Sequence, residues 1–274
     1  MSRRQLLRLA AGSTFLSALG RGSAWAAPVS SSPHPAPTRV RAICFDLFTL
    51  FDPRSVVRVA EAIVGQQAAA LCDLWRVRQF EYSWLRASAR RYVDFEVITR
   101  DALSFAARSR GIALQASDAE RLVGAYSELE PWPDTRDALH TWKRLGLRLA
   151  PLSNYSPRML AHVMGRADLT THFDALISTD VARTFKPDPR AYALGEGQLG
   201  LSREEIVFAA FGGWDAAGAS WFGFNAFWVN RLSVTGEELV SGPVPSGTTF
   251  ADLAAFVAAR TGSVVRRPGS SRRS

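Results

Sequence analysis

An apolar run that stops at an acid constrains the fold of this 274-residue chain more than any other feature. Residues 40–45 read Val-Arg-Ala-Ile-Cys-Phe, and Asp46 follows directly. A short run of this kind is typical of a strand buried on both faces of a parallel sheet. In open α/β sheets, ligands bind at the carboxyl ends of the strands. Asp46 is therefore predicted either to cap the following turn or to act as a nucleophile that forms a covalent intermediate.

The second half of the chain alternates between helical and strand patterns. Strands are predicted at residues 147–152, 175–178, 206–210 and 226–230, with helices at 134–145, 157–165 and 189–199. Such alternation is typical of a parallel sheet with helices on both faces. The predicted fold class is α/β, with a Rossmann-like, doubly wound parallel sheet.

Residues 55–126 break this alternation. Apolar residues there recur every three or four positions, and no strand pattern appears in a segment rich in alanine and arginine. This period is that of amphipathic helices. We therefore expect a helical cap inserted directly after the first strand, with residues 40–54 and 127–262 forming the core domain.

The first residues have the pattern of a targeting signal. Arg3 and Arg4 precede a weakly apolar stretch, and Ala24-Trp25-Ala26 offers a small-x-small cleavage site. Residues 1–26 therefore resemble a twin-arginine export signal, too short for a stable membrane anchor. Export to the periplasm is predicted, with residues 27–39 as a Pro/Ser linker and residues 263–274 as a disordered basic tail.

The formal charge of +8 is concentrated at the two ends of the sequence. Residues 1–26 and the last nine residues hold eight arginines and no acid, so the body between them is neutral. A nucleic-acid partner is not predicted, because binding needs a basic face on a folded element. Cys44 and Cys72 lack the spacing of metal ligands and are predicted to be small buried hydrophobes.

Polar residues follow several of the predicted strands in one order. These are Asp46, then Ser153 and Asn154, then Lys186, and finally Asp215. This order resembles that of the haloacid dehalogenase superfamily. Three stretches resemble its type II (S)-2-haloacid dehalogenases more closely, and the likeness extends over roughly residues 40–260. They are residues 74–86, 185–192 and 214–219.

The resemblance implies a reaction and a catalytic set. It implies hydrolytic dehalogenation of a small (S)-2-halocarboxylate to the (R)-2-hydroxy acid, through an aspartyl ester and without metal or other cofactor. Asp46 would attack the carbon that bears the halogen, and Lys186 would keep Asp46 ionised. Asp215 would anchor Lys186 and activate water. Arg76 would accept the halide, and Thr49 would complete the catalytic set.

The resemblance also implies a substrate-binding set and a possible homodimer through the cap. Ser153 and Asn154 would hold the substrate carboxylate, and Tyr192 would orient the catalytic carboxylates. The remaining members would form an apolar wall that strengthens the nucleophile by excluding water. They are Phe48, Phe80, Phe95 and Trp214.

Two alternatives stay open. Phosphatases of the superfamily need a further acid close behind the nucleophile and extra acids that hold Mg²⁺. This chain has Leu47 behind Asp46, and Asp215 is the only acid in residues 211–219. A phosphatase is therefore disfavoured, since phosphoryl transfer depends on strong electrostatic stabilisation. The other alternative is a catalytically impaired protein that binds small carboxylates.

The impaired alternative arises from departures from the family pattern. The family has a glycine before the threonine that follows the nucleophile, whereas here Thr49 follows Phe48 directly. Ala210 and Gly212 stand where the family has a serine and an asparagine that position water. Tyr155 stands where a glycine is usual and is expected to narrow the cavity. We therefore expect ester formation to survive better than ester hydrolysis.

Overall fold

The structure, a computed structural model, describes residues 39–261. The predicted export signal, the linker up to residue 38 and the basic tail lie outside these residues and stay predictions. Among the described residues no helix combines the length and the apolar character needed to cross a membrane.

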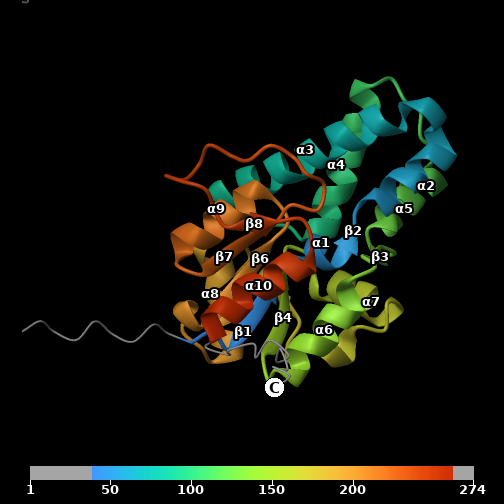
Figure 1. The fold of residues 1–274 in the computed structure, drawn as a ribbon. Coiled ribbons are helices and arrows are strands. Elements are labelled where there is room, and N and C mark those ends of the chain that lie inside the picture. The colour runs from blue at the N-terminus through green and yellow to red at the C-terminus, as the bar shows by residue number, and fades with distance from the viewer. Residues whose placement is uncertain (1–38, 262–274) are drawn as a thin grey trace, which may run out of the picture. The chain divides into compact units, whose positions relative to one another are not determined.

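The core of the described chain is a six-stranded sheet in which every neighbouring pair is parallel (Figure 1). Its strand order is β5-β4-β1-β6-β7-β8. The strands are β1 (Ala42–Phe45), β4 (Arg148–Ser153), β5 (Ile177–Ser178), β6 (Ile206–Ala210), β7 (Asn225–Val229) and β8 (Ser246–Gly247). The central position of β1 explains why its run is apolar at every place, since both faces of the strand are covered.

Each face of the sheet packs against its own layer of helices. Ile43 and Phe45 belong to one core with helices α6 (Thr135–Arg144), α7 (Pro157–Arg166) and α10 (Phe250–Thr261). Ala42 and Cys44 belong to a second core with α8 (Pro189–Leu199) and α9 (Gly213–Phe222). Alternate residues of one strand thus enter opposite cores, and the predicted α/β fold class is confirmed.

The chain leaves the core and returns to it at one place. β2 (Phe51–Asp52) pairs antiparallel with β3 (Glu130–Pro131), and the helices of the cap lie between these strands in sequence. Those helices are α2 (Arg54–Val64), α3 (Ala68–Ser88), α4 (Phe95–Ser109) and α5 (Ala116–Ala125). The remaining elements are α1 (Leu47–Leu50) and the 3₁₀ turns η1 (Gly65–Gln67), η2 (Thr170–His172), η3 (Thr179–Ala182) and η4 (Arg203–Glu205).

Candidate active site

Asp46 lies between the end of β1 and the start of α1. Its main-chain N–H donates to the carbonyl of Ala209 at 2.8 Å, which fixes it against β6. Its side-chain Oδ2 accepts the N–H of Phe48 at 3.1 Å, so Asp46 caps α1 as well as facing the site. No residue from 46 to 52 has a positive φ. The glycine that the family has in this turn is therefore not needed here, because the turn closes as one turn of helix.

Lys186 lies between the two carboxylates that the sequence singled out. Its Nζ donates to Asp46 Oδ1 at 2.6 Å and to Asp215 Oδ2 at 2.6 Å. Burial alone would lower the pKa of Lys186, but the two carboxylates outweigh burial and raise that pKa above its ordinary value. The ammonium is thus charged and keeps a carboxylate charge beside it. No cluster of three or more His, Cys, Asp or Glu side chains suited to a metal occurs in residues 39–261.

Asp215 comes from the first turn of α9 and not from a strand end. It is fully buried behind Lys186, and its Oδ1 accepts the hydroxyl of Tyr192 at 2.7 Å. Burial raises the pKa of Asp215 to about 6, although the charge of Lys186 acts to lower it. Asp215 does not line the cavity, so it reaches the substrate side only past Lys186.

Two predicted site residues do not reach the cavity. Thr49 is buried, and its hydroxyl donates to the main-chain carbonyl of Asp46 at 2.7 Å, so it supports the turn and does not touch the carboxylate. Tyr192 was expected in the substrate-binding set, but it is fully buried against the rings of Phe208 and Phe224. Its hydroxyl donates to Asp215 from the side away from the cavity and orients that carboxylate.

A small cavity of about 30 Å³ lies in front of Asp46. Ser153 and Asn154 line it, and both are held in place by the core. The amide oxygen of Asn154 accepts the main-chain N–H of Lys186 at 2.9 Å, which leaves the amide N–H groups for the cavity. The hydroxyl oxygen of Ser153 accepts the N–H of Tyr155 at 3.1 Å, which leaves its proton free to donate. Two donors therefore face an incoming anion on this side.

Arg76 reaches the cavity from helix α3 of the cap. Its guanidinium lies 5.8 Å, 5.7 Å and 5.4 Å from the ring centres of Phe48, Phe80 and Phe211. Within residues 39–261 no carboxylate lies within ion-pair distance of it. A cation enclosed by aromatic rings, without a counter-ion from these residues, is suited to accept an anion.

The remaining predicted wall residues line the cavity, and the structure adds others. Phe48, Phe80, Phe95 and Trp214 all line it, together with Tyr155, Phe211 and Gly212. Tyr155 stacks on Phe95 with ring centres 5.5 Å apart, and its hydroxyl donates to the carbonyl of Tyr126 at 2.8 Å. Phe211 was missed because nothing in its sequence context distinguishes it from an ordinary core residue.

Trp84 is a second residue that the sequence did not single out. Its indole N–H donates to the main-chain carbonyl of Lys186 at 3.1 Å, and its ring stacks on Phe80. This contact joins α3 of the cap to the segment that carries the lysine. The available signal was the group of aromatic residues in this segment, Trp75, Phe80, Tyr82 and Trp84.

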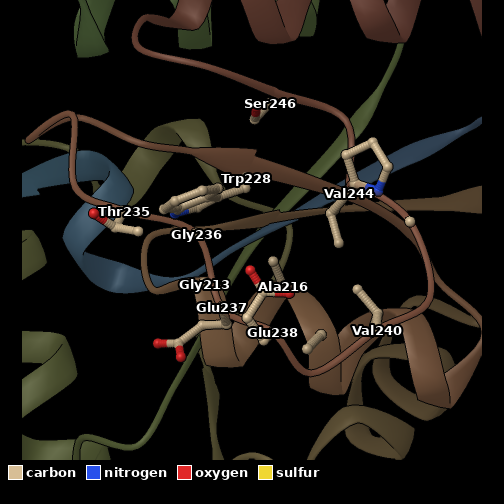
Figure 2. Close-up of a pocket in the computed structure, with 13 residues that line it drawn as sticks. Gly213, Ala216, Trp228, Thr235, Gly236, Glu237, Glu238, Val240, Val244 and Ser246 are labelled. Carbon is tan, nitrogen blue, oxygen red and sulfur yellow. The ribbon is translucent and has the colours of Figure 1, made fainter.

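Two further cavities lie near this site. One of about 90 Å³ shares Phe48, Arg76, Phe80 and Phe95 with it and extends between the cap helices. A larger one of about 420 Å³ lies under the loop that precedes β8, lined by Gly213, Trp228 and two glutamates among others (Figure 2). It shares no lining residue with the cavity at Asp46.

Comparison with known proteins agrees with this geometry. The family model of haloacid dehalogenase-like hydrolases matches residues 40–223. An (S)-2-haloacid dehalogenase from Pseudomonas sp. (strain YL) is 44% identical over 206 residues, which cover 74% of this chain and 88% of that one.

Solved structures of an L-2-haloacid dehalogenase from Xanthobacter autotrophicus are similar, one of them with chloropropionic acid covalently bound. Each has a TM-score of 0.74 and 34% identity, and covers 80% of this chain and 98% of its own. The chain belongs to the haloacid dehalogenase-like hydrolases, within the family of the (S)-2-haloacid dehalogenases.

Proposed function

We propose that this protein hydrolyses the carbon–halogen bond of short (S)-2-halocarboxylates and releases (R)-2-hydroxy acids. One observation carries the proposal. A buried lysine bonds Asp46 and Asp215 at 2.6 Å each, while Asp46 also lines an aromatic cavity that a second cation enters. The relative with covalently bound chloropropionic acid supports the same substrate class and a covalent route.

In the first step Asp46 displaces the halide. A carboxylate oxygen of Asp46 attacks C2 of the substrate from the side opposite the halogen, so that configuration inverts. The C–O bond forms as the carbon–halogen bond breaks, and the halide leaves with the bonding pair toward Arg76. Halide needs no proton to leave, so no acid is required on this side. Ser153 and Asn154 hold the substrate carboxylate through the donors left free by their core contacts.

In the second step water hydrolyses the ester. Water attacks the carboxyl carbon of Asp46 and gives a proton to Lys186 as Lys186 passes one of its own to Asp215, whose Oδ2 it contacts at 2.6 Å. The bond from that carbon to the alkyl oxygen then breaks. The alkoxide recovers the proton as the hydroxy acid, and Asp46 returns to its ionised form beside Lys186 by releasing a proton to solvent.

Chloride release from (S)-2-chloropropionate, with intact-protein mass spectrometry, tests this proposal. We expect one chloride per turnover and a transient mass increase on Asp46. Asp46→Asn should abolish both, since an amide is a poor nucleophile at carbon. An unmodified protein that releases no chloride would contradict the proposal.

Ala210 and Gly212 favour a second candidate, a protein that binds small carboxylates with impaired turnover. Neither residue carries a polar side chain toward the water that must attack the ester. Tight binding of the substrate without chloride release would support this candidate. A phosphatase is supported less, because the ammonium of Lys186 fills the space between the two carboxylates.

We also propose that the protein is exported and forms a homodimer through the cap. The twin-arginine pattern supports export. Helix α3 supports the dimer, because its apolar residues Val77 and Leu85 are 50% and 64% exposed. Sedimentation analysis of wild type and Leu85→Glu tests the dimer, and an unchanged monomer in both would contradict it. Cell fractionation with and without Arg3 and Arg4 tests export.

A further inference from the structure

The nucleophile lies between two strands that bring different groups to the cavity. The sheet order places β4 on one side of β1 and β6 on the other. Ser153 and Asn154 follow β4, and both offer hydrogen-bond donors. From the β6 side the lining residues are Phe211, Gly212 and Trp214. Among these three, the indole N–H of Trp214 is the one side-chain group that can form a hydrogen bond.

Among the other indole N–H groups in residues 39–261, those of Trp75, Trp84, Trp132 and Trp228 each donate to a main-chain carbonyl. Those of Trp142 and Trp221 have no acceptor there, but neither residue lines the cavity at Asp46. The N–H of Trp214 has no acceptor within residues 39–261, although the residue lines the cavity. Trp214 is half-buried, and its unpartnered N–H is accessible to water. The indole N–H of Trp214 is therefore available to bond a molecule that enters the cavity.

Gly212 determines where this nitrogen lies. A Cβ atom on Gly212 would be 2.7 Å from Nε1 of Trp214, so the indole fills the space that a side chain at position 212 would take. On its cap side the indole packs against the rings of Phe80 and Trp84, with centres 5.2 Å and 5.5 Å away. The nitrogen is thus held against the main chain that follows β6, the strand beside Asp46.

We propose that the Trp214 indole N–H holds the water that hydrolyses the ester on Asp46. This inference rests on the proposed function, because it assigns a residue to the second step of that reaction. The substrate carboxylate takes the β4 side and the halide goes to Arg76, which leaves the β6 side for water. The N–H bonds a lone pair of the water oxygen, while the water proton passes by way of Lys186 to Asp215. Indole gives up no proton here, so it positions the water and Asp215 remains the base.

A single-turnover experiment with (S)-2-chloropropionate separates the two steps in the full-length protein. Chloride release reports ester formation, and intact mass reports ester decay. Trp214 also lines the substrate cavity, so in Trp214→Phe we expect both steps to slow, and ester decay to slow more than chloride release. Ester decay should be slower by about tenfold or more, since a lost hydrogen bond of about 1.4 kcal/mol corresponds to tenfold.

Two adjacent glycines provide a matched pair of variants. Gly212→Ala adds a methyl group at 2.7 Å from the indole nitrogen and must displace it. Gly213→Ala adds the same group at 2.8 Å from Cγ of Glu237, which lines the larger cavity (Figure 2). The side chain of Glu237 is exposed and flexible, so it can move away. Neither glycine has a positive φ, so neither change strains the backbone. We expect slow ester decay in Gly212→Ala and wild-type decay in Gly213→Ala.

The outcomes distinguish this inference from the function on which it rests. Wild-type protein that releases no chloride would overturn both. Chloride release with wild-type ester decay in Trp214→Phe would overturn the inference alone. So would an equal loss of chloride release and ester decay in that variant, equal effects of the two glycine variants, or a wild-type ester that never decays.

Discussion

Lys186 shows how one buried side chain sets the charge of the whole site. Its ammonium lies between two carboxylates, so the three groups together carry one negative charge. Arg76 restores neutrality before the anionic substrate arrives. Removing a partner from such a buried group costs more than the ion pair contributes, because the remaining charges stay buried without compensation.

Lys186→Met should therefore destabilise the protein as well as abolish turnover. We expect the free energy of unfolding to fall by about 3–5 kcal/mol at neutral pH, as for other buried pairs that lose one partner. Part of this loss should be recovered as the pH falls, because Asp215 can then become neutral. Urea denaturation at several pH values measures this, and an unchanged free energy of unfolding would contradict it.

Tyr192 acts on the pH dependence through Asp215. The tyrosine hydroxyl donates to the carboxylate and so lowers a pKa that burial has raised to about 6. Activity needs the ionised carboxylate, so it should fall as the pH falls through about 6. In Tyr192→Phe the pKa of Asp215 rises further, and the acidic limb of kcat should move to higher pH by roughly one unit. A pH–rate profile that does not move would rule out this role.

Arg76 should affect the first step. Arg76→Met keeps an unbranched stem but removes the cation that receives the halide, and we expect chloride release to slow by roughly a hundredfold. Arg78→Met is the matched control on the same helix, because Arg78 bonds Glu81 and packs on Phe105 away from the cavity. Rapid chloride detection measures both, and equal effects would contradict the assignment.

At the scale of elements, the sequence predicted the strands of the core better than the short connections. β1, β4, β6 and β7 are apolar runs of ordinary length, so their pattern is decisive. Helix α10 was not predicted, although Phe250, Leu253 and Val257 recur at helical spacing within an alanine-rich segment. The two-residue strands β2 and β3 are too short to have a pattern, and tertiary pairing alone creates them.

The candidate site was predictable in its composition and less so in its geometry. The order of Asp46, Lys186 and Asp215 indicated one cluster, and the structure brings them within hydrogen-bonding distance. The places of Thr49 and Tyr192 could not be predicted, because each depends on which backbone or carboxylate oxygen packing brings nearest. The same holds for Trp214, whose position depends on a missing Cβ in its neighbour.

Tyr155 joins the loop after β4 to the segment after α5, and its loss should be measurable. In Tyr155→Phe the bond from the hydroxyl to the carbonyl of Tyr126 is removed while the ring stays. The carbonyl is left buried, so we expect the free energy of unfolding to fall by about 1–3 kcal/mol. Tyr82→Phe is the control, since its hydroxyl has no partner within residues 39–261. Chemical denaturation compares them, and an equal loss would contradict the prediction.

At the scale of the whole described chain, the cap contacts the core at places other than the crossing strands β2 and β3. Trp84 bonds the carbonyl of Lys186, Tyr92 bonds Asp180, and Glu96 pairs with Arg158. Tyr92→Phe removes one of these bonds, worth about 1 kcal/mol. We expect amide hydrogens of residues 90–95 to exchange about fivefold faster, and unchanged exchange would contradict this role.

The antiparallel pairing of β2 with β3 has a consequence for how the substrate enters the site. The cavity at Asp46 measures about 30 Å³, room for about two waters, so we expect the cap to move when a haloacid enters. Both crossings of the chain lie side by side in this ribbon, which can therefore serve as a pivot. Rotation of the cap about this ribbon would break the contact of Trp84 with Lys186 and would leave Asp46 and Lys186 in place. Each substrate would then enter by displacing the cap, while the charged residues of the core keep their positions.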